Sequence, residues 1–159
     1  MRLEFDVHGK PAGMGSKKAF FVKKLGRAVI TDDNKPAKKN WENAVATAAA
    51  EAMAGRELIT GPVWVQFVFR FARPKAHFRT GKKSHILSDS APEFHINKPD
   101  FDKLCRLMAD AMTGVVYRDD SQIWGAILEK QWTTGSEGAH VIVDSEPIVA
   151  NRSVLTSGA

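Results

Sequence analysis

The chain has 159 residues, of which 43% are hydrophobic and 26% are charged, as in an ordinary globular domain. It contains no run of about 18 apolar residues and does not start with a charged segment followed by an apolar one, so we expect neither a membrane span nor a secretory signal. The single cysteine, Cys105, excludes an internal disulfide framework and suits a reducing, cytoplasmic compartment.

The N-terminal third of the chain predicts a strand, a hairpin and a long helix. Residues 2–8 alternate apolar and charged side chains, which is the pattern of a half-buried strand. A glycine-rich loop follows, and residues 19–31 then predict a hairpin. Asp33 or Asn34 can cap a helix that runs to about Ala54.

Residues 62–72 carry the strongest strand pattern in the chain. Apolar side chains from Val63 to Phe71 occupy every second position. They can form either the core of a sheet or a dimer interface at a strand edge, and the core is the simpler interpretation. Residues 73–95 show no periodicity and many polar residues, which predicts an exposed, mobile loop.

The C-terminal third predicts a helix and two strands. Apolar residues recur at helical spacing after Pro99, and residues 122–132 and 139–144 read as strands. Residues 146–159 lack a pattern, so we expect a disordered tail after one domain of residues 1–145. The fold class is therefore α/β (α+β), with a small mixed sheet and two main helices packed on it.

Positive charge is concentrated in two loops, and the net charge of +5 and isoelectric point near 9.4 favour a polyanionic partner. Solvated loops without a ligand remain an equally good interpretation of the clusters alone. Phe78, inside the second cluster, could stack on an unpaired base. The two clusters consist of Lys17, Lys18, Lys23, Lys24 and Arg27, and of Arg73, Lys75, His77, Arg79, Lys82 and Lys83.

Four aspartates stand in two tight pairs, Asp100 with Asp102 and Asp119 with Asp120. Two carboxylates about 4 Å apart repel each other by about 4 kcal/mol at an effective dielectric constant near 20. A cation relieves this repulsion, and a ligand set made of oxygens favours Mg²⁺ or Mn²⁺. The alternative is that the aspartates cap a helix and a turn, where each contributes about 0.3–1 kcal/mol.

The segment KPDFDKLCRLMADAMTGVVYRDDSQI, residues 98–123, resembles the signature of the RusA-type Holliday junction resolvases. That signature combines basic residues, a D-x-D-N-L motif, a helix with a further basic residue and a D-A pair, and a D-D-x-Q motif at a strand. The segments GKPAGMGSKK, GRAVIT and KKNWENAV also look like many members. The resemblance therefore covers most of residues 5–132, and it implies a RusA-like fold.

The resemblance assigns the essential acidic trio to Asp100, Asp102 and Asp120, as catalytic residues that hold Mg²⁺, with Mn²⁺ as a substitute. Asp119 matches a neighbouring, less critical ligand, and Asp110 matches the helical D-A pair, where a structural role is as good an expectation as a direct one.

Two departures stand out from the family's pattern. Lys103 replaces the usual asparagine, and a lysine inside the pocket would weaken metal binding. Arg106 replaces the usual lysine four residues after Asp102, so it can bind a phosphate or pair with Asp102.

The family implies metal-dependent hydrolysis of DNA at a four-way junction, by paired symmetric cuts from a homodimer. It further implies a phage or prophage origin and action in the cytoplasm of a bacterial or phage-infected cell. Lys98 and Lys103 join the two basic clusters as expected DNA contacts. Two alternatives remain: a module that binds branched DNA without cutting it, and a flap or other structure-specific nuclease.

Overall fold

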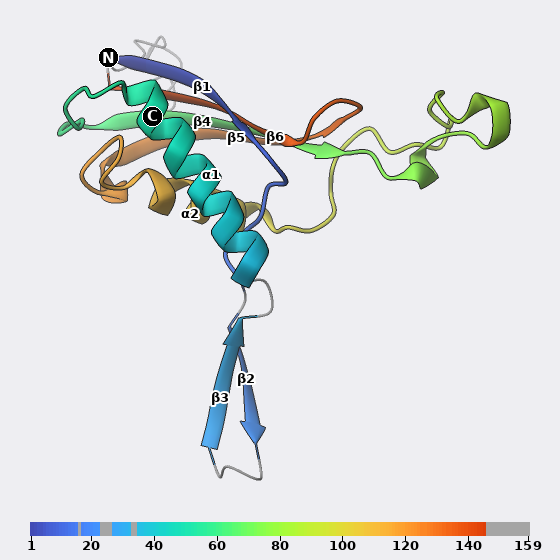
Figure 1. Cartoon of the computed structure of the whole chain (residues 1–159), viewed down its shortest axis with the longest axis horizontal. Helices are drawn as coiled ribbons and strands as arrows, with labels where there is room; N and C mark the ends of the chain where they lie inside the picture. Colours follow the sequence, from blue (N-terminus) through green and yellow to red (C-terminus); the bar gives the residue numbers. More distant parts are fainter. Residues whose placement is uncertain (16, 23–26, 33–34, 146–159) are drawn as a thin grey trace, which may run out of the picture.

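The computed structural model describes residues 1–15, 17–22, 27–32 and 35–145, with the backbone alone for the part between 17 and 35 (Figure 1). The strands are β1 (Arg2–His8), β2 (Lys17–Val22), β3 (Arg27–Asp32), β4 (Val63–Ala72), β5 (Ile123–Thr133) and β6 (Gly138–Asp144). The helices are α1 (Lys35–Met53) and α2 (Phe101–Met112), with short 3₁₀ turns η2 (Lys75–His77), η3 (Gly81–Lys83) and η4 (Asp120–Gln122).

A mixed four-stranded sheet in the order β1-β6-β4-β5 forms the body of the protein. The pairs β1–β6 and β6–β4 are antiparallel, whereas β4–β5 is parallel. A parallel pair needs a long crossover, and here α2 supplies it. Figure 1 shows both helices on one face of this sheet. The predicted class, a single α+β domain with two main helices on a small mixed sheet, is confirmed.

Strand β4 forms the centre of the core. All five alternating apolar residues from Val63 to Phe71 are buried on the side of the sheet that the helices cover. Each large side chain buried in this way contributes about 1.5–3 kcal/mol. Because β4 pairs with β6 on one side and β5 on the other, it has no free edge. The core interpretation is therefore confirmed, and a dimer interface along the edge of this strand is wrong.

The helices bury one stripe each, as their sequences predict. In α1, Trp41, Val45 and Ala49 are buried at intervals of four residues. In α2, six residues between Leu104 and Met112 are buried. In the described part of the chain, neither helix is long and apolar enough to cross a membrane. The expected cap of α1 at Asp33 or Asn34 lies outside the described residues.

Two segments stand apart from the sheet. The predicted hairpin is present as β2 paired with β3, while its turn at 23–26 lies outside the described residues. The predicted loop 73–95 is largely exposed. It is irregular except for two 3₁₀ turns and a bridge between Phe78 and Leu87. Its first part, residues 73–91, projects from the body and is called the arm below (Figure 1). The expected tail, residues 146–159, lies outside the described residues.

Candidate active site

The first aspartate pair lies at the N-terminal end of α2. Asp100 is the residue before the helix, and its extended backbone ends the incoming loop. Asp102 lies in the first turn, where a negative charge is favoured by the helix dipole. Lys103 donates to the Asp100 carboxylate at 2.6 Å, and this hydrogen bond holds the pKa of Asp100 below its usual value. The side chain of Lys103 therefore points toward the acidic pair and forms an ion pair with one of its two members, Asp100.

The second pair lies at the start of η4, just before β5, with Asp119 as the residue before this turn and Asp120 as its first residue. Asp119 accepts from the backbone N–H of Ser121 at 2.9 Å. Hydrogen bonding by the side chain of Ser121, and then by its backbone N–H, lowers the pKa of Asp119. The side chain of Gln122 accepts from the backbone N–H of Asp119 and donates to the carbonyl oxygens of Ile59 and Gly61. Asp119 is thus the capping residue of this turn, which Gln122 ties to the segment before β4.

We expect Asp119→Asn to keep both stability and cleavage, because asparagine caps a helical turn as well as aspartate does. Asp119→Ala should lower the free energy of unfolding by about 0.5–2 kcal/mol, since the turn then loses its cap. Urea unfolding and a DNA cleavage assay on both variants check this. Loss of cleavage in Asp119→Asn with unchanged stability would instead make Asp119 a metal ligand.

Three further carboxylates are exposed and have no hydrogen-bond or ion-pair partner among the described residues; they are called uncommitted below. These residues are Asp102, Asp110 and Asp120. Asp102 and Asp110 lie on one side of α2, about 12 Å apart along its axis. Partial burial and then the charge of Asp120 raise the pKa of Asp110 above its usual value. Asp120 is therefore a neighbour of Asp110, beside the C-terminal half of α2.

Residues of α1 also reach this neighbourhood, although they are not among the predicted site residues. The charge of Glu42 raises the pKa of Asp110 further, while the charges of Arg106 and Lys38 lower it. Lys38 and Glu42 belong to the KKNWENAV segment, whose similarity to the family was the available signal. Packing of α1 against α2 brings these residues to the acidic side of α2.

The predicted trio is not gathered at one point. Asp100 and Asp102 lie at the N-terminal end of α2, while the charge of Asp120 acts on Asp110, in the C-terminal half of the helix. Within the described ranges, no three His, Cys, Asp or Glu side chains could jointly hold a metal ion. The donor chemistry nevertheless fits a hydrated Mg²⁺, which commonly takes one or two carboxylates and keeps several waters. Asp102, Asp110 and Asp120 have oxygens available for such an ion.

Arg106 lies between Asp102 and Asp110 on the same side of α2, and it is exposed. Among the described residues it forms no ion pair with Asp102, and its charge acts on Asp110 instead. A guanidinium group in this position is available to a phosphate, which it can bind through two parallel hydrogen bonds.

The glycine-rich loop after β1 fixes the first turn of α2 from the other side. The backbone N–H of Met14 donates to the carbonyl oxygen of Lys103 at 3.0 Å. Gly13 lies so close that an added Cβ would be 2.9 Å from the Cβ of Lys103. Glycine at this position therefore allows the loop to approach the helix turn that carries Asp102.

Residues 92–99, which lead into α2, are tied to the end of the sheet. Lys130 of β5 donates to the carbonyl oxygens of Asn97 and Pro99, at 2.7 and 3.0 Å. Trp132 donates through its indole N–H to the carbonyl oxygen of Phe94 at 3.1 Å. These bonds hold the backbone immediately before Asp100. Lys130 is not among the predicted site residues, because a lysine in a half-exposed strand carries no signal of such a contact.

His95 is the buried residue of the 92–99 segment. Its ring stacks on Phe71, with the centroids 4.1 Å apart, and lies 4.2 Å from the ring of Trp132. Burial, and then the charge of Lys130, lower the pKa of His95 below its usual value. His95 is thus packed between the two aromatic rings.

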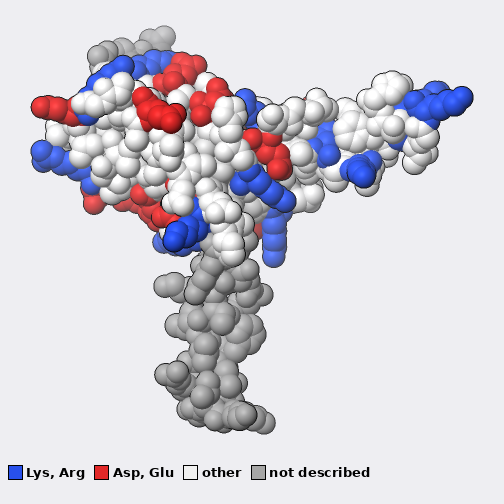
Figure 2. Space-filling model, in the orientation of Figure 1, with Lys and Arg blue, Asp and Glu red and all other residues white. Residues whose placement is uncertain are grey.

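The second basic cluster lies on the arm, where Figure 2 shows Lys and Arg side chains at the far end. Lys75, Lys82 and Lys83 are exposed there. Arg79 is paired with Asp89 at 2.8 Å. Phe78, the predicted stacking residue, is half-buried. The arm therefore presents lysines suited to phosphate contacts.

Two members of that cluster hold the root of the arm instead. Arg73 donates to the carbonyl oxygen of Pro92 at 2.9 Å and lies over the ring of Trp132. His77 meets the same ring edge-on at 4.8 Å. Lys98 is exposed, one residue before Pro99. The first basic cluster consists of Lys17, Lys18, Lys23, Lys24 and Arg27, whose side chains lie outside the described residues.

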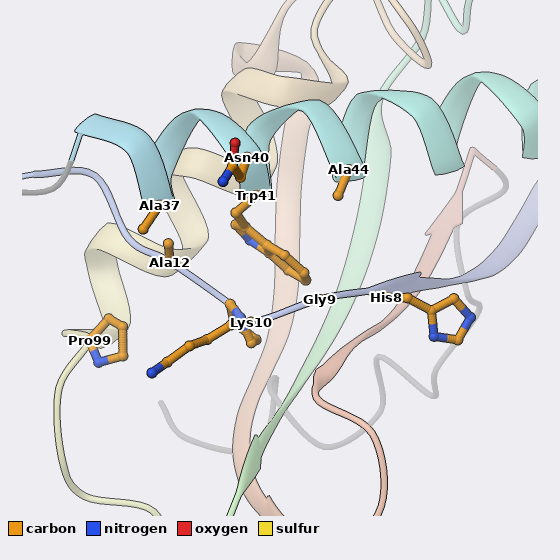
Figure 3. A pocket seen from close by; sticks show the side chains of 10 residues that line it. His8, Gly9, Lys10, Ala12, Ala37, Asn40, Trp41, Ala44 and Pro99 are labelled. Atoms are coloured by element: carbon orange, nitrogen blue, oxygen red, sulfur yellow. The ribbon is translucent and has the colours of Figure 1, made fainter.

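A cavity of about 540 Å³ borders the N-terminal end of α2 (Figure 3). Its walls come from α1, from the stretch after β1 and from Pro99. Trp41 fills the space between α1 and Gly9, and its indole N–H has no partner among the described residues. The polar lining is limited to His8, Lys10 and Asn40. None of the predicted site residues lines it.

Two comparisons with known proteins extend these observations. The model of a family described as Endodeoxyribonuclease RusA matches residues 9–144. The chain is also 26% identical, over 121 residues, to "Uncharacterized protein YqaN" of Bacillus subtilis (strain 168). That similarity covers 76% of this chain and 81% of the other protein. The family match includes both aspartate pairs, α2 and the whole arm.

Proposed function

Because the chain belongs to the RusA family of endodeoxyribonucleases, we propose that it resolves Holliday junctions by metal-dependent, paired symmetric hydrolysis of DNA phosphodiesters. The observation that carries the proposal is the row of uncommitted carboxylates, Asp102, Asp110 and Asp120, next to exposed basic residues. A protein that only binds DNA phosphates gains nothing from an acidic surface at this place, because the carboxylates of the protein and the phosphates of the DNA repel each other.

We propose that Asp102, in the first turn of α2, and Asp120, beside Asp110, each hold a hydrated Mg²⁺ ion, with Mn²⁺ as a substitute. Asp100 joins Asp102 when the ammonium group of Lys103 leaves the Asp100 carboxylate and binds a phosphate of the DNA. Bound there, a divalent ion supplies orientation and polarisation of the scissile phosphate and lowers the pKa of an attacking water. Arg106, on the same side of α2, stabilises the charge that develops on the phosphate oxygens. The lysines of the arm hold the backbone of the junction.

A junction must be cut at two opposed points, so we propose a two-fold homodimer with one site in each subunit. Strand β5 supports this, since it forms an edge of the sheet and none of its residues is buried. Trp124 and Ile127 of this strand are 56% and 45% exposed. An exposed edge with large apolar side chains is the surface on which a second sheet edge can pair.

The test is cleavage of three labelled DNAs of matched sequence: a four-way junction, a linear duplex and a flap. Each is incubated with the protein in Mg²⁺, in Mn²⁺ and in EDTA. We expect paired cuts at symmetric positions of the junction only, and only when a divalent ion is present.

The same assay separates the alternatives. Cutting of the flap in preference to the junction would replace the resolvase with another structure-specific nuclease. Tight junction binding without any cutting, in either metal, would leave a branched-DNA-binding module.

A further inference from the structure

Two large apolar side chains next to the proposed site are turned into solvent. Phe94 is 70% exposed and Ile96 is 85% exposed, whereas His95 between them is only 6% exposed. The middle residue is therefore directed into the protein, and its two neighbours are directed away from it. The segment is the stretch between the arm and α2 in Figure 1. An apolar pair so exposed on a conformationally fixed backbone marks an interaction surface.

The backbone that presents this pair is held by three side chains, which bond to four of its carbonyl oxygens. Arg73 donates to the carbonyl oxygen of Pro92, Trp132 to that of Phe94, and Lys130 to those of Asn97 and Pro99. The His95 ring is seated between the rings of Phe71 and Trp132. The exposed side chains therefore do not collapse onto the protein. Because their backbone is already ordered, little conformational entropy is lost there when a partner binds.

The surroundings of the pair favour DNA as the partner. Lys98 follows Ile96 by two residues and is exposed, and Lys103 lies on the first turn of α2. Asp100 follows Ile96 by four residues, which limits their separation to about 14 Å. A phosphate at the proposed site would thus place bases within reach of Phe94 and Ile96. Lysines beside an apolar surface suit DNA, because the lysines can contact its phosphates and the apolar side chains can contact the planes of its bases.

A four-way junction differs from a duplex in one way that matters here. At the branch point, base pairs end and their flat apolar faces lose a stacking neighbour, whereas in a continuous duplex these faces are covered. We infer that Phe94 and Ile96 form an apolar wedge that contacts the open base-pair faces at the branch point, so that the enzyme favours junctions over duplexes. This inference rests on the proposed function, and it adds the residues that recognise the branch.

The test uses the double variant Phe94→Ala/Ile96→Ala of the full chain, with Ile86→Ala as the control. Ile86 is an apolar residue of the arm that is 40% exposed. Binding is measured in EDTA to a junction with 2-aminopurine at the branch point and to a duplex of the same sequence. We expect the double variant to lose about tenfold in junction affinity, with duplex affinity unchanged. The 2-aminopurine fluorescence should change when wild type or Ile86→Ala binds, because a side chain then contacts the base, and it should stay at the value of the free junction with the double variant.

Equal junction affinity and equal fluorescence for the double variant and the wild type would overturn the wedge. So would a lighter sedimenting species for the double variant, since a second copy of the chain would then cover the pair. The unfolding temperature of each variant shows that the fold is intact. If wild type cuts the junction while the wedge result is negative, the proposed function stands and only the wedge fails. If wild type neither prefers nor cuts the junction, both fail.

Discussion

Asp102→Asn abolishes cleavage of the junction and leaves its binding intact. The substitution keeps the shape of the side chain and removes its charge, and Asp102 has no hydrogen-bond partner to lose among the described residues. Changes to groups that merely orient metal ligands cost 10–100-fold, so loss of a ligand should lower the cleavage rate by more than about 100-fold. Single-turnover cleavage in Mg²⁺ gives the rate, and gel-shift titration in EDTA gives the affinity.

Glu51→Gln is the matched control for Asp102→Asn. Glu51 is an exposed carboxylate on α1, so the variant makes the same change in net charge away from α2. Cleavage by Glu51→Gln should equal that of wild type. If both variants lost activity equally, the cause would be net charge, and if Asp102→Asn cut at the wild-type rate, its assignment as a ligand would be wrong. Asp120→Asn should repeat the result, because the proposal gives it the same role.

Gly13→Ala destabilises the protein and slows cleavage, although Gly13 has no chemical group to contribute. The new Cβ would lie 2.9 Å from the Cβ of Lys103 and 3.3 Å from its carbonyl carbon. Either the loop or the first turn of α2 must move, and such overpacking costs about 1–3 kcal/mol. The bond from Met14 to Lys103 is strained at the same time. A displacement of about 1 Å at Asp102 can by itself lower the rate by about 100-fold.

Gly61→Ala provides the comparison for Gly13→Ala. No atom lies within 4 Å of a Cβ at Gly61. That variant should therefore unfold at the urea concentration of wild type or slightly above it, since alanine restricts the unfolded chain by about 0.4–1 kcal/mol. Urea unfolding and cleavage rates are measured for both. A Gly13→Ala protein as stable and as active as Gly61→Ala would contradict the close packing of the loop on α2.

Local patterns in the sequence predicted the secondary structure and the fold class. The period-2 alternation of β4 and the helical spacing after Pro99 report which residues face the core, and burial of those residues follows them closely. The two aspartate pairs could also be predicted from local sequence. One stands at the start of α2 and the other at the start of η4, and a single family signature spans both.

Contacts between distant parts of the chain were not predictable in this way. The pairing of Lys103 with Asp100 was one of several outcomes left open, and so was the nearness of Asp120 to Asp110. The ties from Lys130 to the loop before Asp100 link residues about thirty positions apart. No periodicity encodes them, because they depend on how the segment before α2 lies against β5.

The sequence by itself determined where strands and helices form, which of their faces are apolar, and which residue types can serve as ligands. These properties follow from the backbone geometry of each segment and from the transfer of apolar side chains out of water. Only the tertiary structure decided that β4 lies inside the sheet, which carboxylates are occupied and which are available, and that Phe94 and Ile96 face solvent. Those outcomes depend on the packing of β4, α2 and β5 as one unit, since packing alone sets the distances between residues far apart in the chain.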